Sequence, residues 1–298
     1  MTIDLKGTFL PVTTPFDPVT GDVDLAEYRS NLRAWFAHPI RGVLVAGSTG
    51  EAVYLDDGES AALLEATREE IPAGRLILMG TGAESTRATI KKTKKAAAAG
   101  ADAVLVKPPA FYKAAMTPEA LLRHYRAVAD ASPVPVIVYQ VPLRLSTLEF
   151  PTEVVAGLAS HPNIAGAKDS RGDLAKLGEL VKACPAGFQV VAGAGSVLLG
   201  GLELGAVGGI VAVGLFAPAE CAEISVAFYE GRKADAARLQ ERMTPLHVGV
   251  VGGTGVPGIK VAMDMVGLRG GDPRPPLLPV PQARRDEIRG LLQVGGML

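Results

Sequence analysis

Residues 135–170 read PVIVYQVPLRLSTLEFPTEVVAGLASHPNIAGAKDS and contain one complete copy of the pattern that decides the fold. An apolar, β-rich run at 135–139 is followed by a loop, a segment with helical spacing at 152–160 and a second apolar run at 164–168. Parallel strands that helices cover on both faces are apolar throughout rather than alternating. The stretch therefore predicts a strand–helix–strand unit in which the two strands are parallel.

The same alternation extends in both directions over about 215 residues. Strands are expected at residues 8–12, 42–46, 76–80, 103–106, 135–139, 164–168, 189–192 and 209–213. Helices are expected between them at residues 26–37, 57–70, 85–99, 118–131, 152–160, 173–183 and 196–204. Eight evenly spaced units suit a (β/α)8 TIM barrel, which typically takes about 250 residues, better than a doubly wound open sheet.

The chain continues beyond the eighth strand with further helical runs, expected at 217–230, 234–250, 259–266 and 282–292. The proline-rich stretch PRPPLLPVP at 273–281 suits neither a helix nor a central strand. We therefore expect a barrel over residues 1–215 and a C-terminal helical extension over residues 216–298.

Composition restricts the classes of partner. Hydrophobic residues make up 48% of the chain, and 30 Lys and Arg balance 31 Asp and Glu for a net charge of −1. The chain has no block of basic residues that would attract nucleic acid or an anionic membrane. No signal peptide or membrane-spanning stretch is expected. The two cysteines, Cys184 and Cys221, suit buried free thiols and a cytoplasmic location.

The chemistry of a TIM barrel lies at the carboxyl ends of its strands. Lys168 ends an apolar strand, and burial there would lower the pKa of its amine and make it a nucleophile toward a carbonyl. Tyr139 ends the preceding strand, about 4.8 Å away, where its phenol would exchange protons with an adduct. The simpler alternatives are a lysine paired with Asp169 or Glu51 and a core tyrosine with a satisfied hydroxyl.

The sequence GSTGE at 47–51 predicts a tight turn with adjacent backbone N–H groups and two hydroxyls, those of Ser48 and Thr49. Such a turn, opening onto a helix N-terminus, suits a carboxylate ligand. A helix-capping turn without a ligand is the alternative. Glu51 would then lie in the first helical turn and complement the helix dipole.

The sequence also contains features typical of two other chemistries, serine hydrolysis and metal binding. AGSTG at 46–50 resembles a nucleophile elbow, so a serine hydrolase is an alternative, with His247 as its one available base. The four histidines are dispersed without metal-ligand spacing, so they are expected at the surface or at helix caps. No metal and no organic cofactor is expected.

Taken together, these residues resemble the dihydrodipicolinate synthase / N-acetylneuraminate lyase family of class I pyruvate aldolases. The resemblance runs from FLPVTTPF (9–16) through GSTGE, YQVP (139–142) and IAGAKDS (164–170) to TGVPGIKVAMDMVGL (254–268). It implies a (β/α)8 barrel with a C-terminal helical extension, usually assembled as a homotetramer.

The resemblance also implies roles for residues. Lys168 would form a Schiff base with pyruvate or another 2-oxo acid, and Tyr139 would shuttle protons. Ser48 and Thr49 would bind the carboxylate of the 2-oxo acid and relay protons, and Tyr112 would reach the relay across a subunit contact. Four more residues match positions that contact substrate: Arg144, Ser170, Gly193 and Ile210.

Within the family, several segments resemble 4-hydroxy-2-oxoglutarate aldolase, among them GAESTRATIKKT (82–93), ELGAVGGIVAV (203–213) and the serine that follows the lysine. The expected reaction is cleavage of 4-hydroxy-2-oxoglutarate to pyruvate and glyoxylate. The alternative is the condensation of pyruvate with aspartate semialdehyde by a 4-hydroxy-tetrahydrodipicolinate (dihydrodipicolinate) synthase, since Arg144 matches the arginine that holds the aldehyde's carboxylate. A barrel that binds a 2-oxo acid without turnover is a more remote alternative.

Overall fold

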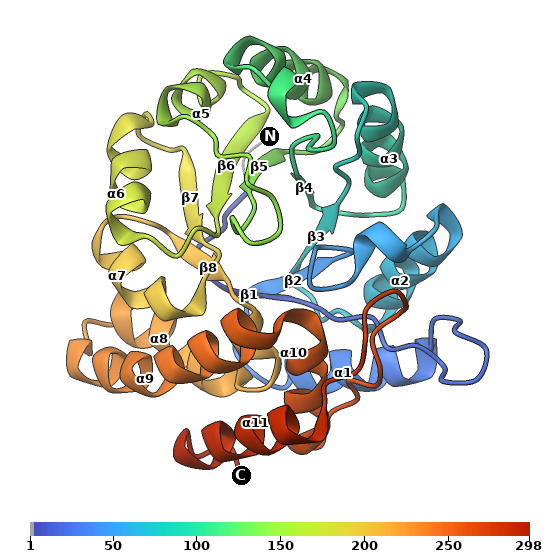
Figure 1. Cartoon of the computed structure of the whole chain (residues 1–298). Coiled ribbons are helices and arrows are strands. Elements are labelled where there is room, and N and C mark those ends of the chain that lie inside the picture. The colour runs from blue at the N-terminus through green and yellow to red at the C-terminus, as the bar shows by residue number, and fades with distance from the viewer. Residues whose placement is uncertain (1–2) are drawn as a thin grey trace.

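The computed structural model describes residues 3–298 and contains eight parallel strands closed into a barrel (Figure 1). Each strand pairs with the next, and the last pairs with the first. The strands are β1 (Gly7–Pro11), β2 (Gly42–Val45), β3 (Leu76–Gly80), β4 (Ala103–Val106), β5 (Val136–Gln140), β6 (Ile164–Asp169), β7 (Gln189–Ala192) and β8 (Gly208–Ile210). The predicted TIM barrel is confirmed.

Helices surround the strands, as Figure 1 shows in a view along the barrel. Those between strands are α1 (Leu25–Phe36), α2 (Asp57–Glu70), α3 (Thr86–Ala98), α4 (Pro118–Ala131), α5 (Thr152–Leu158), α6 (Leu174–Ala183) and α7 (Leu198–Glu203). Short 3-10 turns occupy Ala52–Tyr54 (η1), Lys113–Ala115 (η2), Gly195–Val197 (η3) and Ala212–Leu215 (η4).

Local capping explains why the helices begin where the sequence predicts. Thr117 caps α4, with Pro118 in the first turn, where a missing N–H costs nothing. Asp56 and Glu59 form a reciprocal capping box at the start of α2. The final strand differs from expectation, because the apolar run expected as strand at 209–213 turns into η4 after three strand residues.

Two apolar layers hold the barrel together. One lies between strands and helices, and the other fills the barrel interior with side chains such as Phe9, Leu78 and Ile137. Tyr139 belongs to the interior layer. Successive strand residues face opposite sides of the sheet. The inward position of Tyr139 therefore determines which side chains of β5, and of its partner strand β6, face the barrel interior.

The C-terminal region consists of α8 (Pro218–Tyr229), α9 (Lys233–Leu246), α10 (Gly253–Met265) and α11 (Gln282–Val294). Helix α8 packs on β1, where the Thr8 hydroxyl lies 2.9 Å from the carbonyl oxygen of Cys221. In Figure 1, α9, α10 and α11 gather on the side of the barrel where α8 and α1 lie.

Helices α9 and α10 are joined by a π-helical turn, η5 (His247–Gly252), into one run of 33 residues. This run is long and apolar enough to cross a membrane, and half of its most apolar window is buried inside the fold. The run bends at Gly255, whose φ of 64° lies in the left-handed region.

Candidate active site

A cavity of about 1060 Å³ opens at the carboxyl ends of the strands. The loops that follow the strands form most of its wall, and the segment from His247 to Ile259 closes the rest. Eight of the nine site residues expected from the sequence line this cavity: Ser48, Thr49, Tyr139, Arg144, Lys168, Ser170, Gly193 and Ile210.

Lys168 lies inside the mouth of the barrel on β6, with only 5% of its surface exposed. It is in register with Tyr139 on β5, and its Nζ lies 4.6 Å from the centre of the tyrosine ring. Burial lowers the pKa of the Lys168 amine, and the neighbouring Tyr139 phenol partly offsets that effect. The geometry therefore brings a desolvated amine and a phenol together, as the sequence predicts.

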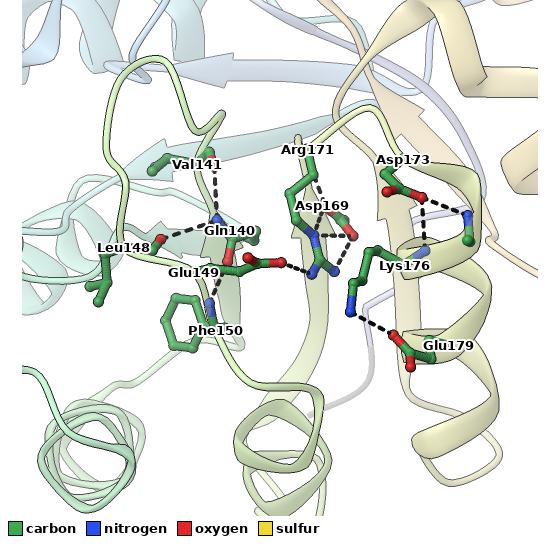
Figure 2. Close-up of polar contacts among 11 residues, drawn as sticks. Gln140, Val141, Leu148, Glu149, Phe150, Asp169, Arg171, Asp173, Lys176 and Glu179 are labelled. Carbon is green, nitrogen blue, oxygen red and sulfur yellow. Dashed lines mark hydrogen bonds and ion pairs between the residues drawn. The ribbon is translucent and has the colours of Figure 1, made fainter.

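Lys168 forms no ion pair with any carboxylate among residues 3–298. Asp169 projects from the opposite face of β6, where the Arg171 guanidinium lies 2.6 Å from its Oδ2. Figure 2 shows Arg171 between Asp169 and Glu149, whose Oε1 lies 2.9 Å from Arg171 Nη1. The alternative in which Lys168 is a structural partner of Asp169 does not hold.

The loop that carries Arg144 is fixed by the buried side chain of Gln140 (Figure 2). Its Nε2 donates to the carbonyl oxygens of Val141 at 2.9 Å and Leu148 at 3.3 Å, and its Oε1 accepts from the Phe150 N–H at 2.7 Å. Arg144 itself forms no hydrogen bond or ion pair with the described residues. Its guanidinium is thus available to a substrate anion.

The turn at 47–51 departs from the expectation of a helix N-terminus. It leads into the three-residue η1, and α2 begins only at Asp57. Ser48 and Thr49 are half-buried on the cavity wall, and left-handed residues lie on either side of them, Ala46 at φ 48° and Glu51 at φ 57°. Hydroxyls and backbone N–H groups, rather than a helix dipole, are what this turn offers a carboxylate.

Glu51 does not lie in a first helical turn, so its expected role there was wrong. Its left-handed backbone directs the buried carboxylate toward α10, where Oε1 lies 2.6 Å from Lys260 Nζ. Oε2 accepts a hydrogen bond from the Arg274 N–H at 2.8 Å. Glu51 therefore ties the turn to the C-terminal region and is not free to pair with Lys168.

Ser170 offers the cavity a second unengaged group. Its buried Oγ forms no hydrogen bond with the described residues. A methyl group on Gly193 would lie 1.8 Å from this oxygen, so only glycine fits there. A buried hydroxyl without a partner costs free energy unless a ligand or water satisfies it. Ser170 and the Gly193 backbone thus form one wall suited to a polar ligand.

Tyr112 is the expected site residue that the structure leaves outside the cavity. It is 74% exposed and packs edge-to-face on Phe111, with ring centres 5.1 Å apart. Glu84 holds the loop, because its carboxylate accepts from the N–H groups of Ala110 and Phe111 at 2.9 Å. A role for Tyr112 requires the cavity of another subunit and stays a prediction.

His247 stands at the C-cap position of α9, as expected of a capping histidine, but it also lines the cavity, which sequence reasoning did not predict. Its Nδ1 accepts a hydrogen bond from the Gly195 N–H at 3.2 Å. Burial, together with the nearby Arg144 cation, lowers the pKa of His247 to about 4. The segment predicts a plain helix, and no local signal marks the π turn that begins at this residue.

His124 is likewise buried rather than exposed, with Nδ1 2.9 Å from Thr86 Oγ1. The serine hydrolase alternative gains no support. Across the described chain no hydrogen bond joins Ser48 to His247, whose Nδ1 already binds backbone.

The chain is similar to known proteins over nearly its whole length. The family model of the dihydrodipicolinate synthetase family matches residues 4–294. The chain is 37% identical, over 79% of its length and 77% of the relative's, to a probable mitochondrial 4-hydroxy-2-oxoglutarate aldolase of Emericella nidulans. It is 35% identical, over 92% of both chains, to the 4-hydroxy-tetrahydrodipicolinate synthase of Exiguobacterium sibiricum.

Solved structures share the whole fold. The pyruvate complex of a dihydrodipicolinate synthase from Acinetobacter baumannii superposes with a TM-score of 0.93 at 28% identity, covering 99% of this chain and all of the other. A prophage protein of the same family from E. coli K12, also in complex with pyruvate, gives 0.91 at 27% identity, covering 99% of both chains. The curated relatives are named as an aldolase and a synthase, and this chain is an enzyme of the lyase and aldolase kind that these names indicate. It belongs to the dihydrodipicolinate synthetase family.

Proposed function

We propose that this enzyme is a class I aldolase that cleaves 4-hydroxy-2-oxoglutarate into pyruvate and glyoxylate through a Schiff base on Lys168. The observation that carries the proposal is the buried Lys168 amine, which has no carboxylate partner and lies beside the Tyr139 ring. Burial favours the uncharged form of the amine, which is the nucleophile, whereas solvent favours the cation of an exposed lysine.

The reaction follows from these groups. The Lys168 amine adds to the C2 carbonyl, and water leaves with a proton that Tyr139 supplies. The resulting protonated imine accepts the electron pair of the C3–C4 bond once the C4 hydroxyl gives its proton to Tyr139, with Ser48 or Thr49 relaying it. Glyoxylate departs, the enamine takes at C3 the proton that Tyr139 received from the C4 hydroxyl, and water hydrolyses the pyruvate imine.

The substrate's two carboxylates need two sites. The turn that carries Ser48 and Thr49 suits the carboxylate next to the carbonyl, with Ser170, Gly193 and Ile210 around the pyruvate half. The unpaired Arg144 guanidinium suits the distal carboxylate, which becomes that of glyoxylate. A substrate without that second charge would leave Arg144 without a partner.

A second candidate is the condensation of pyruvate with aspartate semialdehyde. The names of several relatives support it, including one from Syntrophus aciditrophicus at 31% identity over 98% of this chain and 99% of the relative. The relative named as a 4-hydroxy-2-oxoglutarate aldolase and the serine at position 170 favour the cleavage reaction. Both candidates require an aldehyde that carries a carboxylate.

We also propose that the enzyme is a homotetramer and is located in the cytoplasm. The exposed aromatic pair Phe111 and Tyr112 supports a subunit contact at this loop, since large exposed apolar side chains mark interaction sites. Light scattering on the purified protein would give four times the mass of one chain. A monomer would remove the role of Tyr112 in a neighbouring cavity.

The proposal is tested by assaying pyruvate release from 4-hydroxy-2-oxoglutarate and, in parallel, pyruvate consumption with aspartate semialdehyde. We expect cleavage to be the faster reaction, and Lys168→Met to abolish it while the protein stays folded by circular dichroism. Faster consumption with aspartate semialdehyde would favour the second candidate. Turnover by Lys168→Met at the wild-type rate would overturn the proposed mechanism.

A further inference from the structure

We propose that His247 determines specificity for the aldehyde half of the substrate: its Nε2–H donates a hydrogen bond to the carboxylate that Arg144 also binds. The inference deepens the proposed function and rests on it. The residue lies in the C-terminal region, outside the strand ends from which the rest of the chemistry comes.

His247 lies on the cavity wall at a distinctive point of the backbone. It is the first residue of the π-helical turn η5 between α9 and α10. Such turns are rare overall, but those that occur are often found at functional sites. His247 lines the cavity, while Leu246 beside it is fully buried in the core, because successive residues of a helix point in different directions around its axis.

The hydrogen bonds of the ring fix its tautomer. Gly195 donates its N–H to Nδ1, so the proton of the neutral ring resides on Nε2. Gln240 holds the same glycine from the other side, donating from Nε2 to the Gly195 carbonyl oxygen at 2.9 Å. A methyl group on Gly195 would lie 2.4 Å from Val213 Cγ1. Glycine is therefore required at position 195, where the backbone N–H donates to His247.

His247 Nε2–H is therefore a donor without a partner among the described residues, on a ring that faces the cavity. The lowered pKa agrees with a neutral ring at pH 7, as burial and Arg144 both oppose a second proton. A neutral donor beside a guanidinium binds an anion without adding a second positive charge to be buried.

Arg144 reaches the same wall. A methyl group on Gly255 would lie 3.4 Å from Arg144 Nη1, so the guanidinium extends to the segment that follows His247. The other cations of the cavity are engaged elsewhere: Lys107 with Glu84 at 2.8 Å, and Arg171 with Asp169.

The Thr254 hydroxyl on this wall is also occupied, because it donates to the Val250 carbonyl oxygen at 2.6 Å. Arg144 and His247 are thus two unengaged donors on this wall that can meet a distal carboxylate.

Two substitutions separate the functions of the two ring nitrogens. In His247→Asn, the side-chain carbonyl takes the place of Nδ1 and accepts from Gly195, but the cavity donor is lost. In His247→Gln, the amide nitrogen reaches the position of Nε2 and restores the donor. His38→Asn, at a half-buried histidine outside the cavity, is the matched control.

Each enzyme is assayed on 4-hydroxy-2-oxoglutarate and on 4-hydroxy-2-oxopentanoate, in which a methyl group replaces the distal carboxylate. We expect His247→Asn to lower kcat/KM on the diacid by about 10- to 100-fold, the range for a hydrogen bond to a charged group. Its loss on the methyl substrate should be at least ~10-fold smaller by the same reasoning. His247→Gln should recover most of the diacid activity, and pyruvate should still form its borohydride-trapped adduct in every variant.

Equal losses on both substrates would mean that His247 only supports the fold, and wild-type values on both would mean that it contacts nothing. Either result overturns the inference while leaving the proposed function intact. A wild-type enzyme that traps no pyruvate and cleaves neither substrate would instead overturn the proposed function, and this inference with it.

Discussion

The buried ion pair between Glu51 and Lys260 makes a quantitative prediction about how the site is held. Lys260 is fully buried, its Nζ lies 2.6 Å from Glu51 Oε1, and it also donates to the Asp272 carbonyl oxygen at 2.9 Å. Lys260→Met keeps the apolar stem and removes the ammonium. The Glu51 carboxylate would then keep one hydrogen bond, from the Arg274 N–H, in a dry environment.

Removing one partner of a buried pair costs about 3–5 kcal/mol, because the other charge is left uncompensated. That is a large part of the roughly 5–15 kcal/mol by which a domain is stable. Glu51→Gln combined with Lys260→Met removes both charges and keeps the acceptor for the Arg274 N–H. We expect the double variant to regain about 1–3 kcal/mol relative to the sum of the single losses.

The free energy of unfolding is measured in urea by circular dichroism and by the fluorescence of Trp35, the single tryptophan, which is fully buried in α1. The control is Lys176→Met, which removes a surface pair with Glu179 at 3.2 Å (Figure 2). Such exposed pairs contribute about 0–1 kcal/mol. A loss below about 1 kcal/mol for Lys260→Met, or strictly additive losses in the double variant, would refute the reasoning.

Three further predictions follow from the site and its surroundings. Tyr139→Phe should lower kcat by about 10²- to 10⁴-fold while pyruvate still binds, because the proton shuttle is lost; a wild-type kcat would remove that role. Gln140→Ala should raise KM for the carboxylated substrate more than it changes the yield of pyruvate adduct, since it releases the Arg144 loop; equal effects would contradict this. Burial lowers the pKa of His124 to about 4, with the Lys107 cation adding to the effect, so its contribution to stability is complete above pH 6.5 and lost as pH falls toward 4. Protonation of His124 should lower the unfolding free energy by about 2 kcal/mol from pH 7 to pH 5, and this share of the drop should be absent in His124→Gln; identical pH curves for the two proteins would contradict it.

The sequence predicted the barrel because every strand–helix unit repeats the same signals. Strands at 76–80, 103–106 and 189–192 have the predicted bounds, since parallel strands buried on both faces are uniformly apolar and end at clear turn residues. Helix starts at Thr117 and Asp56 follow from capping side chains close by in the chain. These features are local, which is why the sequence alone could predict them.

Features set by distant contacts could not be predicted in this way. Glu51 looks like a first-turn acid, but its partners Lys260 and Arg274 lie more than 200 residues further along the chain. His247 looks like part of an ordinary helix, and its contact with the Gly195 backbone at the cavity joins residues 52 positions apart in the chain. Polar contacts between the barrel and its C-terminal helices produce no periodic pattern in the sequence from which they could be predicted.

The measurement that tests the central claim most directly is reduction with borohydride in the presence of pyruvate, followed by peptide mass spectrometry. We predict one stable pyruvate adduct per chain, on the peptide that contains Lys168, and none in Lys168→Met. An adduct on another lysine, or no adduct while the enzyme turns over its substrate, would contradict the account.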